Sequence, residues 1–223
     1  SGDYRYRQVD GWAKGRTLGI ASGVAADSRD RVYVLDREPS HEVVVFDRDG
    51  QFLSCWGGDL FVLPHDIWVD SEDRLYIADC GDHTVRICSG DGEILETLGT
   101  LNQPGAEGVP FNQPSRAVRA PSGDLYVSDG YGNARIHKFS PDGKLILSWG
   151  GPGSMPGEFN FPHKICCDAD GWVYVADRES HRVQVFDAGG DFLHKWGGPF
   201  ALGLYGPFKG WFTTATSIAI GPE

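Results

Sequence analysis

Two histidines stand directly after a proline at matching points of the sequence, His65 in LPH and His163 in FPH. A neutral imidazole is a preferred ligand of zinc and related metals, so this pair predicts two ligands of one metal ion. The alternative is that each histidine is satisfied by backbone hydrogen bonds at a turn. Ser22, Ser115 and Thr216 hold the equivalent positions elsewhere in the chain.

Three more side chains lie just after repeated aspartates, and they predict binding of an anionic substrate and proton transfer. Arg37 and Arg178 belong to a chain of formal net charge −11 and favour capture of a carboxylate. Salt bridges to Glu38 or Glu179 are the structural alternative. Tyr131 lies between two glycines that leave its ring exposed, and it is interpreted as a general base whose pKa is lowered by a metal and the two arginines. The alternative for this tyrosine is a packing or surface aromatic.

Other recurring polar residues are interpreted as structural. The histidines before the expected third strand of three repeats predict contacts between neighbouring units, and they are His41, His83 and His181. An aspartate that recurs in every repeat predicts a turn cap rather than a catalyst, at Asp36, Asp79, Asp129 and Asp177. The sequence holds no nucleophile-elbow, Walker or dinucleotide-binding motif.

Internal repetition predicts the elements that position these side chains. Four segments align, at about residues 20–58, 63–99, 114–151 and 162–198, with a partial fifth at 212–223, and the anchor tyrosines are Tyr33, Tyr76, Tyr126 and Tyr174. Each full repeat has four short runs rich in Val, Ile, Tyr and Phe between polar turns, which predicts antiparallel strands. Four strands in a period of roughly 40 to 50 residues are typical of a β-propeller blade. The chain is therefore predicted to be all-β, with one propeller domain over residues 1–223.

Both ends of the chain predict incomplete blades. Residues 4–12 have the pattern of an isolated fourth strand, with Trp12 in the place of the tryptophan that ends other repeats. Residues 216–221 have the pattern of the first strand of a new blade, and 221–223 that of its outgoing turn. Because the second and third strands of that blade are missing, we expect the domain to be truncated at its C-terminus and to expose an unpaired edge. A second copy of the chain or a missing segment would complete it.

Composition excludes several classes of protein. With 20 Lys and Arg against 31 Asp and Glu, the chain is predicted to bind neither nucleic acid nor an anionic membrane surface. The content of 31 Gly and 13 Pro excludes a helical bundle. The five cysteines follow no zinc-finger or redox spacing and are interpreted as buried thiols, with a Cys80–Cys88 disulfide as the alternative. They leave the compartment open. The first residues lack the apolar stretch of a signal peptide, and an extracytoplasmic or secreted location is favoured.

Two resemblances add to these interpretations. The segment VYVADRESHRVQVF at 173–186 resembles the NHL repeat, and this resemblance covers about residues 20–200. A narrower resemblance, to peptidyl-α-hydroxyglycine α-amidating lyase, is carried by YVSDGYGNARI at 126–136, FSPDGK at 139–144, PGEF at 156–159, FPH at 161–163 and ADRE at 176–179. It implies a six-bladed propeller that cleaves a peptidyl-hydroxyglycine to a peptide amide and glyoxylate.

The lyase family uses zinc on three histidines, a tyrosine base, two arginines and a structural calcium. By motif, the matching residues are His65 and His163 for the zinc, Tyr131 for the base, and Arg37 and Arg178 for the arginines. The third histidine has no match, and the best-aligned position carries Thr216. The resemblance thus implies zinc as cofactor, with calcium as a second metal.

These observations predict a metal-dependent lyase similar to the amidating lyase. Its substrate would be a small molecule or peptide bearing a carboxylate. In this hypothesis a metal polarises the carbinol oxygen, an arginine holds the carboxylate, and the tyrosine takes the hydroxyl proton. Two alternatives stay open because a fold does not fix a function. They are a non-catalytic NHL binding module for a protein or small ligand, and another metal-dependent reaction such as lactone hydrolysis.

Overall fold

The computed structural model describes residues 7–105, 110–197 and 214–220, which contain four four-stranded antiparallel sheets. Blade 1 consists of β1 (Ile20–Ala26), β2 (Val32–Glu38), β3 (Glu42–Phe46) and β4 (Phe52–Trp56). Blade 2 consists of β5 (Pro64–Val69), β6 (Leu75–Asp79), β7 (Thr84–Cys88) and β8 (Ile94–Leu98). Blade 3 consists of β9 (Arg116–Arg119), β10 (Leu125–Asp129), β11 (Arg135–Phe139) and β12 (Leu145–Gly150). Blade 4 consists of β13 (Pro162–Cys167), β14 (Val173–Asp177), the single 3-10 turn Arg178–Ser180, β15 (Arg182–Phe186) and β16 (Phe192–Gly197).

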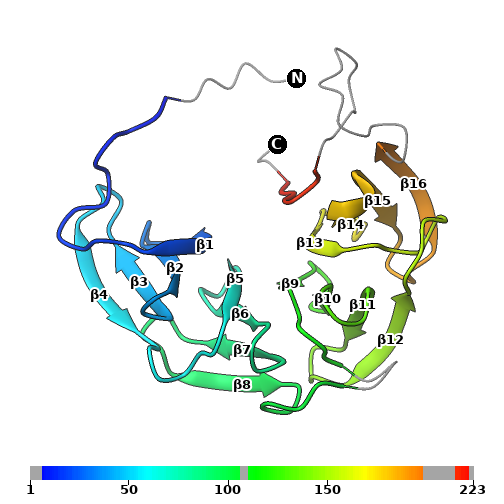
Figure 1. Ribbon diagram of the computed structural model, residues 1–223, viewed down its shortest axis with the longest axis horizontal. Coiled ribbons are helices and arrows are strands. Elements are labelled where there is room, and N and C mark those ends of the chain that lie inside the picture. The colour runs from blue at the N-terminus through cyan, green and yellow to red at the C-terminus, as the bar shows by residue number, and fades with distance from the viewer. Residues whose placement is uncertain (1–6, 106–109, 198–213, 221–223) are drawn as a thin grey trace.

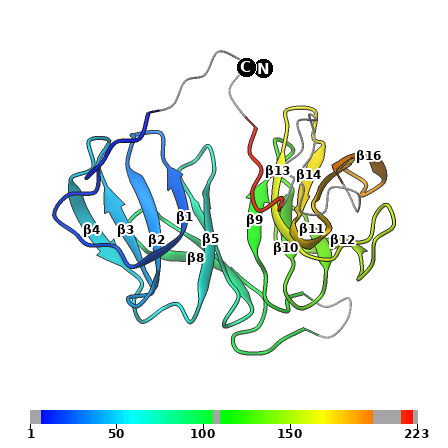
Figure 2. The same cartoon turned by 45° about the horizontal axis from the view of Figure 1, so that its top comes forward.

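The four sheets surround a common centre (Figure 1). Within each sheet the strands lie side by side in chain order, so β1, β5, β9 and β13 are innermost and β4, β8, β12 and β16 form the rim. Figure 2 shows that the inner strands β5 and β9 run beside each other, and the two are in contact. The all-β propeller that the repeats predict is therefore confirmed. No helix among the described residues is long and apolar enough to cross a membrane.

A hydrogen bond from the anchor tyrosine fixes the turn that precedes it in three of the blades. Tyr33 donates to Asp27 at 3.0 Å, and the same bond recurs in blades 2 and 4. Blade 3 differs because alanine stands at position 120, where the other blades have the aspartate. There the hydroxyl of Tyr126 donates instead to the carbonyl of Ala188 in blade 4, at 3.3 Å.

The three largest core clusters lie between adjacent blades, and a smaller one packs blade 1 against the N-terminal segment. Phe111 is fully buried in the cluster that joins blades 2 and 3, and Phe159 is fully buried in the cluster that joins blades 3 and 4. Trp149, from the end of blade 3, packs against the second of these clusters. Burial of this kind fixes the angle between neighbouring blades, and it thereby brings the entrances of the inner strands together.

The N-terminal segment departs from its prediction. Residues 7–12 form no strand, so the strand predicted at 4–12 is wrong for its described part, and the rest lies outside the described residues. A glycine with φ of +63° at position 11 interrupts any extended run. Beyond it, Lys14 pairs in parallel with Gln51 beside β4. The segment therefore runs along the rim of blade 1 and does not complete a final blade.

The C-terminal prediction also needs correction. Residues 214–220 form no strand, so the first strand predicted at 216–221 is wrong where it is described, and the turn at 221–223 lies outside the described residues. Ala215 and Ile218 instead pack against the apolar side chains of blade 4. This packing holds the backbone of the segment beside β13.

The five cysteines are free thiols, and one of the three repeated histidines makes a hydrogen bond between blades. All five cysteines are free, so the alternative of a Cys80–Cys88 disulfide is wrong. Burial raises the pKa of both of these thiols to about 11, which makes them poor nucleophiles. The histidine before the third strand has a left-handed backbone in every repeat that carries it. His83 in addition accepts a hydrogen bond from the N–H of Gln113 at 3.1 Å, which confirms its structural role between blades 2 and 3.

Candidate metal and catalytic site

A repeated aspartate cap sets the start of the inner strands in blades 2 and 4. Asp79, at the end of β6, accepts hydrogen bonds from the N–H groups of the two residues before Pro64, at 2.7 and 2.9 Å. Asp177, at the end of β14, does the same for the two residues before Pro162, at 3.0 and 2.8 Å. These contacts confirm the predicted turn-capping role in both blades. They place the histidine that follows each proline at the same register.

The two histidines and the tyrosine of the predicted site meet at one end of the channel. The ring centroids of His65 and His163 are 4.9 Å apart. The hydroxyl oxygen of Tyr131 lies 2.8 Å from Nε2 of His65 and 3.4 Å from Nε2 of His163. The three side chains come from blades 2, 4 and 3 respectively, so the fold converges three repeats on one point. Their chemical roles stay predictions.

Both imidazoles are held in the tautomer and charge state that metal binding requires. Nδ1 of His65 is 2.8 Å from the carbonyl oxygen of Ser115, and Nδ1 of His163 is 2.6 Å from that of Thr216. Because a carbonyl can only accept, each Nδ1 carries the proton and each Nε2 presents a lone pair toward Tyr131. Burial lowers the pKa of His65 to about 4, against the opposing effect of its hydrogen bond to Ser115. Burial also lowers the pKa of His163, so both rings are neutral at pH 7.

Serine and histidine side chains alternate around the inner ring, and each ties its blade to the next. Ser22 Oγ donates to the carbonyl of Pro64 at 3.1 Å, and Ser115 Oγ donates to the carbonyl of Pro162 at 2.9 Å. The Nδ1–H of each histidine likewise donates to a carbonyl one repeat ahead. Hydrogen bonds between successive repeats therefore orient the two candidate ligands, an arrangement common behind metal-ligating histidines.

Thr216, the position best aligned with a third histidine, makes the same backbone contact as Ser115. Its carbonyl oxygen accepts from His163 just as the carbonyl oxygen of Ser115 accepts from His65. In this alternation of side chains Thr216, like Ser115, supplies a carbonyl to the histidine of the preceding repeat.

Arg178 lies against an aromatic wall of the site. Its guanidinium carbon is 4.6 Å from the ring centroid of Phe161, and that ring packs edge-on against Tyr131 with centroids 4.2 Å apart. Nε of Arg178 donates to Glu179 at 2.8 Å, so the salt bridge named as the structural alternative is also present. Sequence reasoning missed Phe161 as a site residue. The signal that could have found it is its place directly before the proline and His163.

Arg37 approaches the site from β2 with an unsatisfied donor. Its Nε is buried without a hydrogen-bond partner and lies 3.9 Å from Oε1 of Glu38. Its charge acts to lower the pKa of both Tyr131 and Cys80, against the larger effect of burial. A buried N–H without a partner is a group that an oxygen of a bound anion can satisfy.

The protein side chains alone raise the pKa of Tyr131, and the predicted lowering by a metal stays a prediction. Burial raises this pKa above its ordinary value, while the charge and hydrogen bond of Arg178 and the charge of Arg37 act in the opposite direction without outweighing burial. The side chains of this site alone therefore do not make the phenol a base at neutral pH. A metal cation close to the hydroxyl would add the missing positive charge.

The described residues fit part of a zinc site. Two neutral Nε2 atoms of His65 and His163 on either side of the Tyr131 hydroxyl match the nitrogen and oxygen preference of zinc. Within residues 7–105, 110–197 and 214–220, no group of three or more His, Cys, Asp or Glu side chains is placed to hold a metal. The described part of the chain thus offers two protein ligands for such an ion.

Comparison with known proteins identifies the repeats and the relatives. The NHL repeat family matches residues 55–88, 111–139 and 159–186. The chain is 34% identical over 211 residues to NHL repeat-containing protein 3 of Homo sapiens, a match that covers 87% of this chain and 60% of that protein. It is 35% identical over 186 residues to peptidyl-alpha-hydroxyglycine alpha-amidating lyase 1 of Drosophila melanogaster, covering 75% of this chain and 34% of that protein.

Solved structures support the same fold. A streptogramin B lyase superposes with a TM-score of 0.64 at 14% sequence identity, over 83% of this chain and 57% of the other. At that identity the likeness concerns the fold alone. The chain spans 60% of the length of NHL repeat-containing protein 3 and less of the lyase. It is an NHL-repeat β-propeller that resembles the amidating lyase, as the repeats and motifs predict.

Proposed function

We propose that this NHL-repeat propeller is a zinc-dependent lyase that cleaves a carbinolamide, such as a peptidyl α-hydroxyglycine, to a peptide amide and glyoxylate. The observation that carries the proposal is the convergence of two neutral imidazole nitrogens on one phenol. The 35% identity to a protein named as an amidating lyase supports the same reaction class. Because the chain spans 34% of that relative, the activity is proposed for the whole protein.

In this proposal the arginines bind and orient the substrate carboxylate. The Arg178 guanidinium is held over the ring of Phe161, which limits its motion and leaves N–H groups for a planar anion. Arg37 brings a buried donor without a partner, which a second carboxylate oxygen would satisfy. Together they would position the carbinol carbon next to Tyr131.

Tyr131 is the proposed base. Zinc bound by His65 and His163 would act as a Lewis acid on the carbinol oxygen and favour the phenolate form of the tyrosine. Tyr131 then takes the hydroxyl proton, the O–H electron pair forms the carbonyl of glyoxylate, and the C–N bond breaks. Delivery of that proton from the phenol to the departing nitrogen completes the peptide amide and restores the phenolate.

Elemental analysis of the purified protein tests whether His65 and His163 bind zinc. We expect near-stoichiometric zinc in the native protein and its loss from the His65→Ala/His163→Ala double variant. The His194→Ala variant, which alters a histidine on the rim strand β16, is the matched control and should keep its zinc. Tyr131→Phe should also keep zinc while glyoxylate release falls by about 10²-fold or more. Absence of zinc from the native protein, even after zinc is supplied, would refute the proposal.

A second candidate function is a non-catalytic binding module for a protein or small ligand. Two observations favour it, namely the match of 87% of the chain to NHL repeat-containing protein 3 and the two ligands that the described residues offer. Such a module would bind a carboxylate-bearing ligand at the two arginines with no need of metal. Carboxylate binding that is unchanged by a zinc chelator would favour the module, whereas chelator-sensitive binding would favour the lyase.

A further inference from the structure

Three charged side chains stand one residue after the ring of histidines and serines. Asp66 follows His65 on β5, Arg116 opens β9, and Lys164 follows His163 on β13. Nη1 of Arg116 is 2.6 Å from Oδ2 of Asp66, and Nζ of Lys164 is 3.0 Å from Oδ1 of the same carboxylate. The three therefore form an ion triad that joins the inner strands of blades 2, 3 and 4.

The triad is largely buried. The side chain of Asp66 is 1% exposed, and those of Arg116 and Lys164 are 13% and 15% exposed. A carboxylate buried to this degree is costly unless it is paired, and here both of its oxygens face a cation. Removal of either kind of partner would leave a charge in a poorly solvated place.

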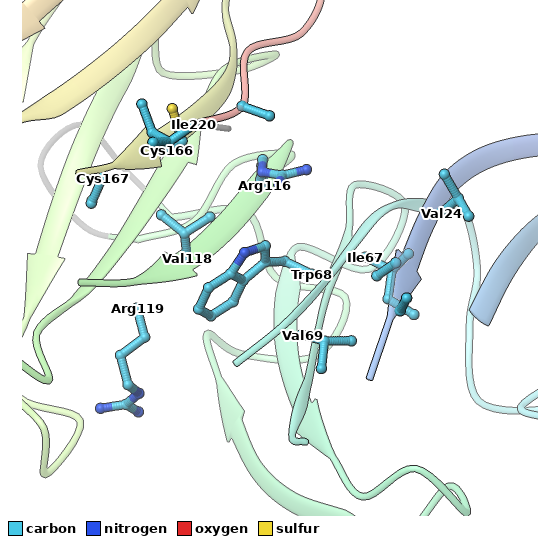
Figure 3. Close-up of a pocket in the computed structure, with 13 residues that line it drawn as sticks. Val24, Ile67, Trp68, Val69, Arg116, Val118, Arg119, Cys166, Cys167 and Ile220 are labelled. Carbon is cyan, nitrogen blue, oxygen red and sulfur yellow. The ribbon is translucent and has the colours of Figure 1, made fainter. Parts of the chain in front are cut away.

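The channel beside the triad has no described acidic group to offer a metal ion. A cavity of about 340 Å³ opens there, and Figure 3 shows Arg116, Trp68 and Val118 on its wall, with Arg119 further along. Its described lining contains these two arginines and no carboxylate. Calcium takes about six to eight oxygen ligands and favours carboxylates. The lining of this cavity therefore does not fit the structural calcium that the lyase resemblance implies.

We propose that the Asp66–Arg116–Lys164 triad fastens the three blades across the channel, so that this propeller needs no structural calcium. Arg116 and Lys164 supply from the chain itself the positive charge that a bound cation would bring. The net charge of the triad is +1, which disfavours a further cation next to it. This inference concerns the fold and stands independently of the proposed lyase activity.

Thermal unfolding of the whole chain tests the triad. The native protein is melted in millimolar calcium chloride and in EGTA, and the midpoint is expected to differ by less than ~2 °C between the two. Asp66→Asn keeps the shape of the side chain but leaves two cations unpaired, and should lower the midpoint by roughly 6 °C or more. Asp142→Asn is the matched control because Asp142 pairs with Lys144 in full exposure. Its midpoint should stay within ~1 °C of native.

A double-mutant cycle distinguishes the interaction between Asp66 and Arg116 from other destabilising effects of each substitution. If the two side chains interact, Arg116→Met should lower the midpoint by less in the Asp66→Asn background than in the native protein. Should Asp66→Asn not fold, Lys164→Met, which keeps the Asp66–Arg116 pair, replaces it and should still lose ~2 °C or more. The proposal is overturned if calcium raises the unfolding midpoint of the native protein by more than ~2 °C. It is also overturned if the triad variants lower that midpoint by less than ~2 °C.

Discussion

Replacement of Asp79 by alanine tests how the strand caps hold the candidate site. The Asp79 carboxylate is fully buried and accepts hydrogen bonds from the N–H groups of Val62, Leu63, Gly81 and Asp82, at 2.7, 2.9, 2.8 and 3.3 Å. The first two donors lie in the loop that leads into β5. The variant leaves all four without their acceptor, so it should loosen both the blade and the histidine that begins its inner strand.

The expected decrease in the free energy of unfolding is larger than that caused by an average substitution. A hydrogen bond to a charged acceptor contributes about 1.5 to 3 kcal/mol, and three of these bonds have good geometry. Relaxation of the loop and entry of water recover part of the loss, which leaves about 4 kcal/mol. For a chain of 223 residues this corresponds to a fall in melting temperature of about 8 to 16 °C.

Asp36→Ala in blade 1 is the matched control, because the same position there makes fewer bonds. Asp36 accepts from the N–H of Gly19 at 3.0 Å and from the hydroxyl of Ser40 at 3.1 Å, so about 2 kcal/mol is expected. Thermal and urea unfolding give the two stabilities, and zinc content reports on the site in blade 2. Equal losses in the two variants, or a native melting temperature for Asp79→Ala, would refute the reasoning.

Two further predictions concern acid stability and the loop of the tyrosine. Burial raises the pKa of Asp70, but hydrogen bonds from Arg74 and Tyr76 outweigh it and hold the pKa below 3.8. The ionised carboxylate thus stabilises the fold fully above about pH 4, and this stabilisation is lost as the pH falls through the lowered pKa. The melting temperature of Asp70→Asn should therefore lie below that of the native protein at about pH 7, and the difference should shrink toward about pH 3. A difference that stays constant with pH would contradict this. Gly132→Ala should cost about 1 to 3 kcal/mol in urea unfolding, because the added Cβ overlaps Asn112, and unchanged stability would show that the loop yields freely.

The blades could be predicted from the sequence because their defining contacts are local. Tyr33 and its counterparts in blades 2 and 4 donate to an aspartate six residues earlier, so spacing alone reveals the turn. The same spacing hides the exception, since Tyr126 reaches into the next blade. The strand expected at residues 4–12 fails because Lys14 pairs with Gln51 on the rim, a contact that no local pattern encodes.

In the candidate site, too, positions within a repeat could be predicted and contacts between repeats could not. His65, His163 and Tyr131 could be found because each lies at a fixed place within its own repeat. The surroundings of these residues could not, because they arise between repeats. The carbonyl that Thr216 offers to His163 comes from 53 residues away, and the place of Phe161 between Arg178 and the tyrosine depends on side-chain directions that spacing does not reveal.

The alternation of serine and histidine around the inner ring shows that contact between blades does not require a metal ligand. Ser22 and His65 both tie their blade to a carbonyl of the next one, yet of the two only the imidazole carries a second ring nitrogen of the kind that zinc prefers. Exchange of serine and histidine at such a position would therefore remove or add a candidate ligand while a hydrogen-bond donor to the next blade is kept. The candidate metal site and the contacts between blades can thus change separately, because Nδ1 of each histidine serves the blade contact while Nε2 faces the candidate site.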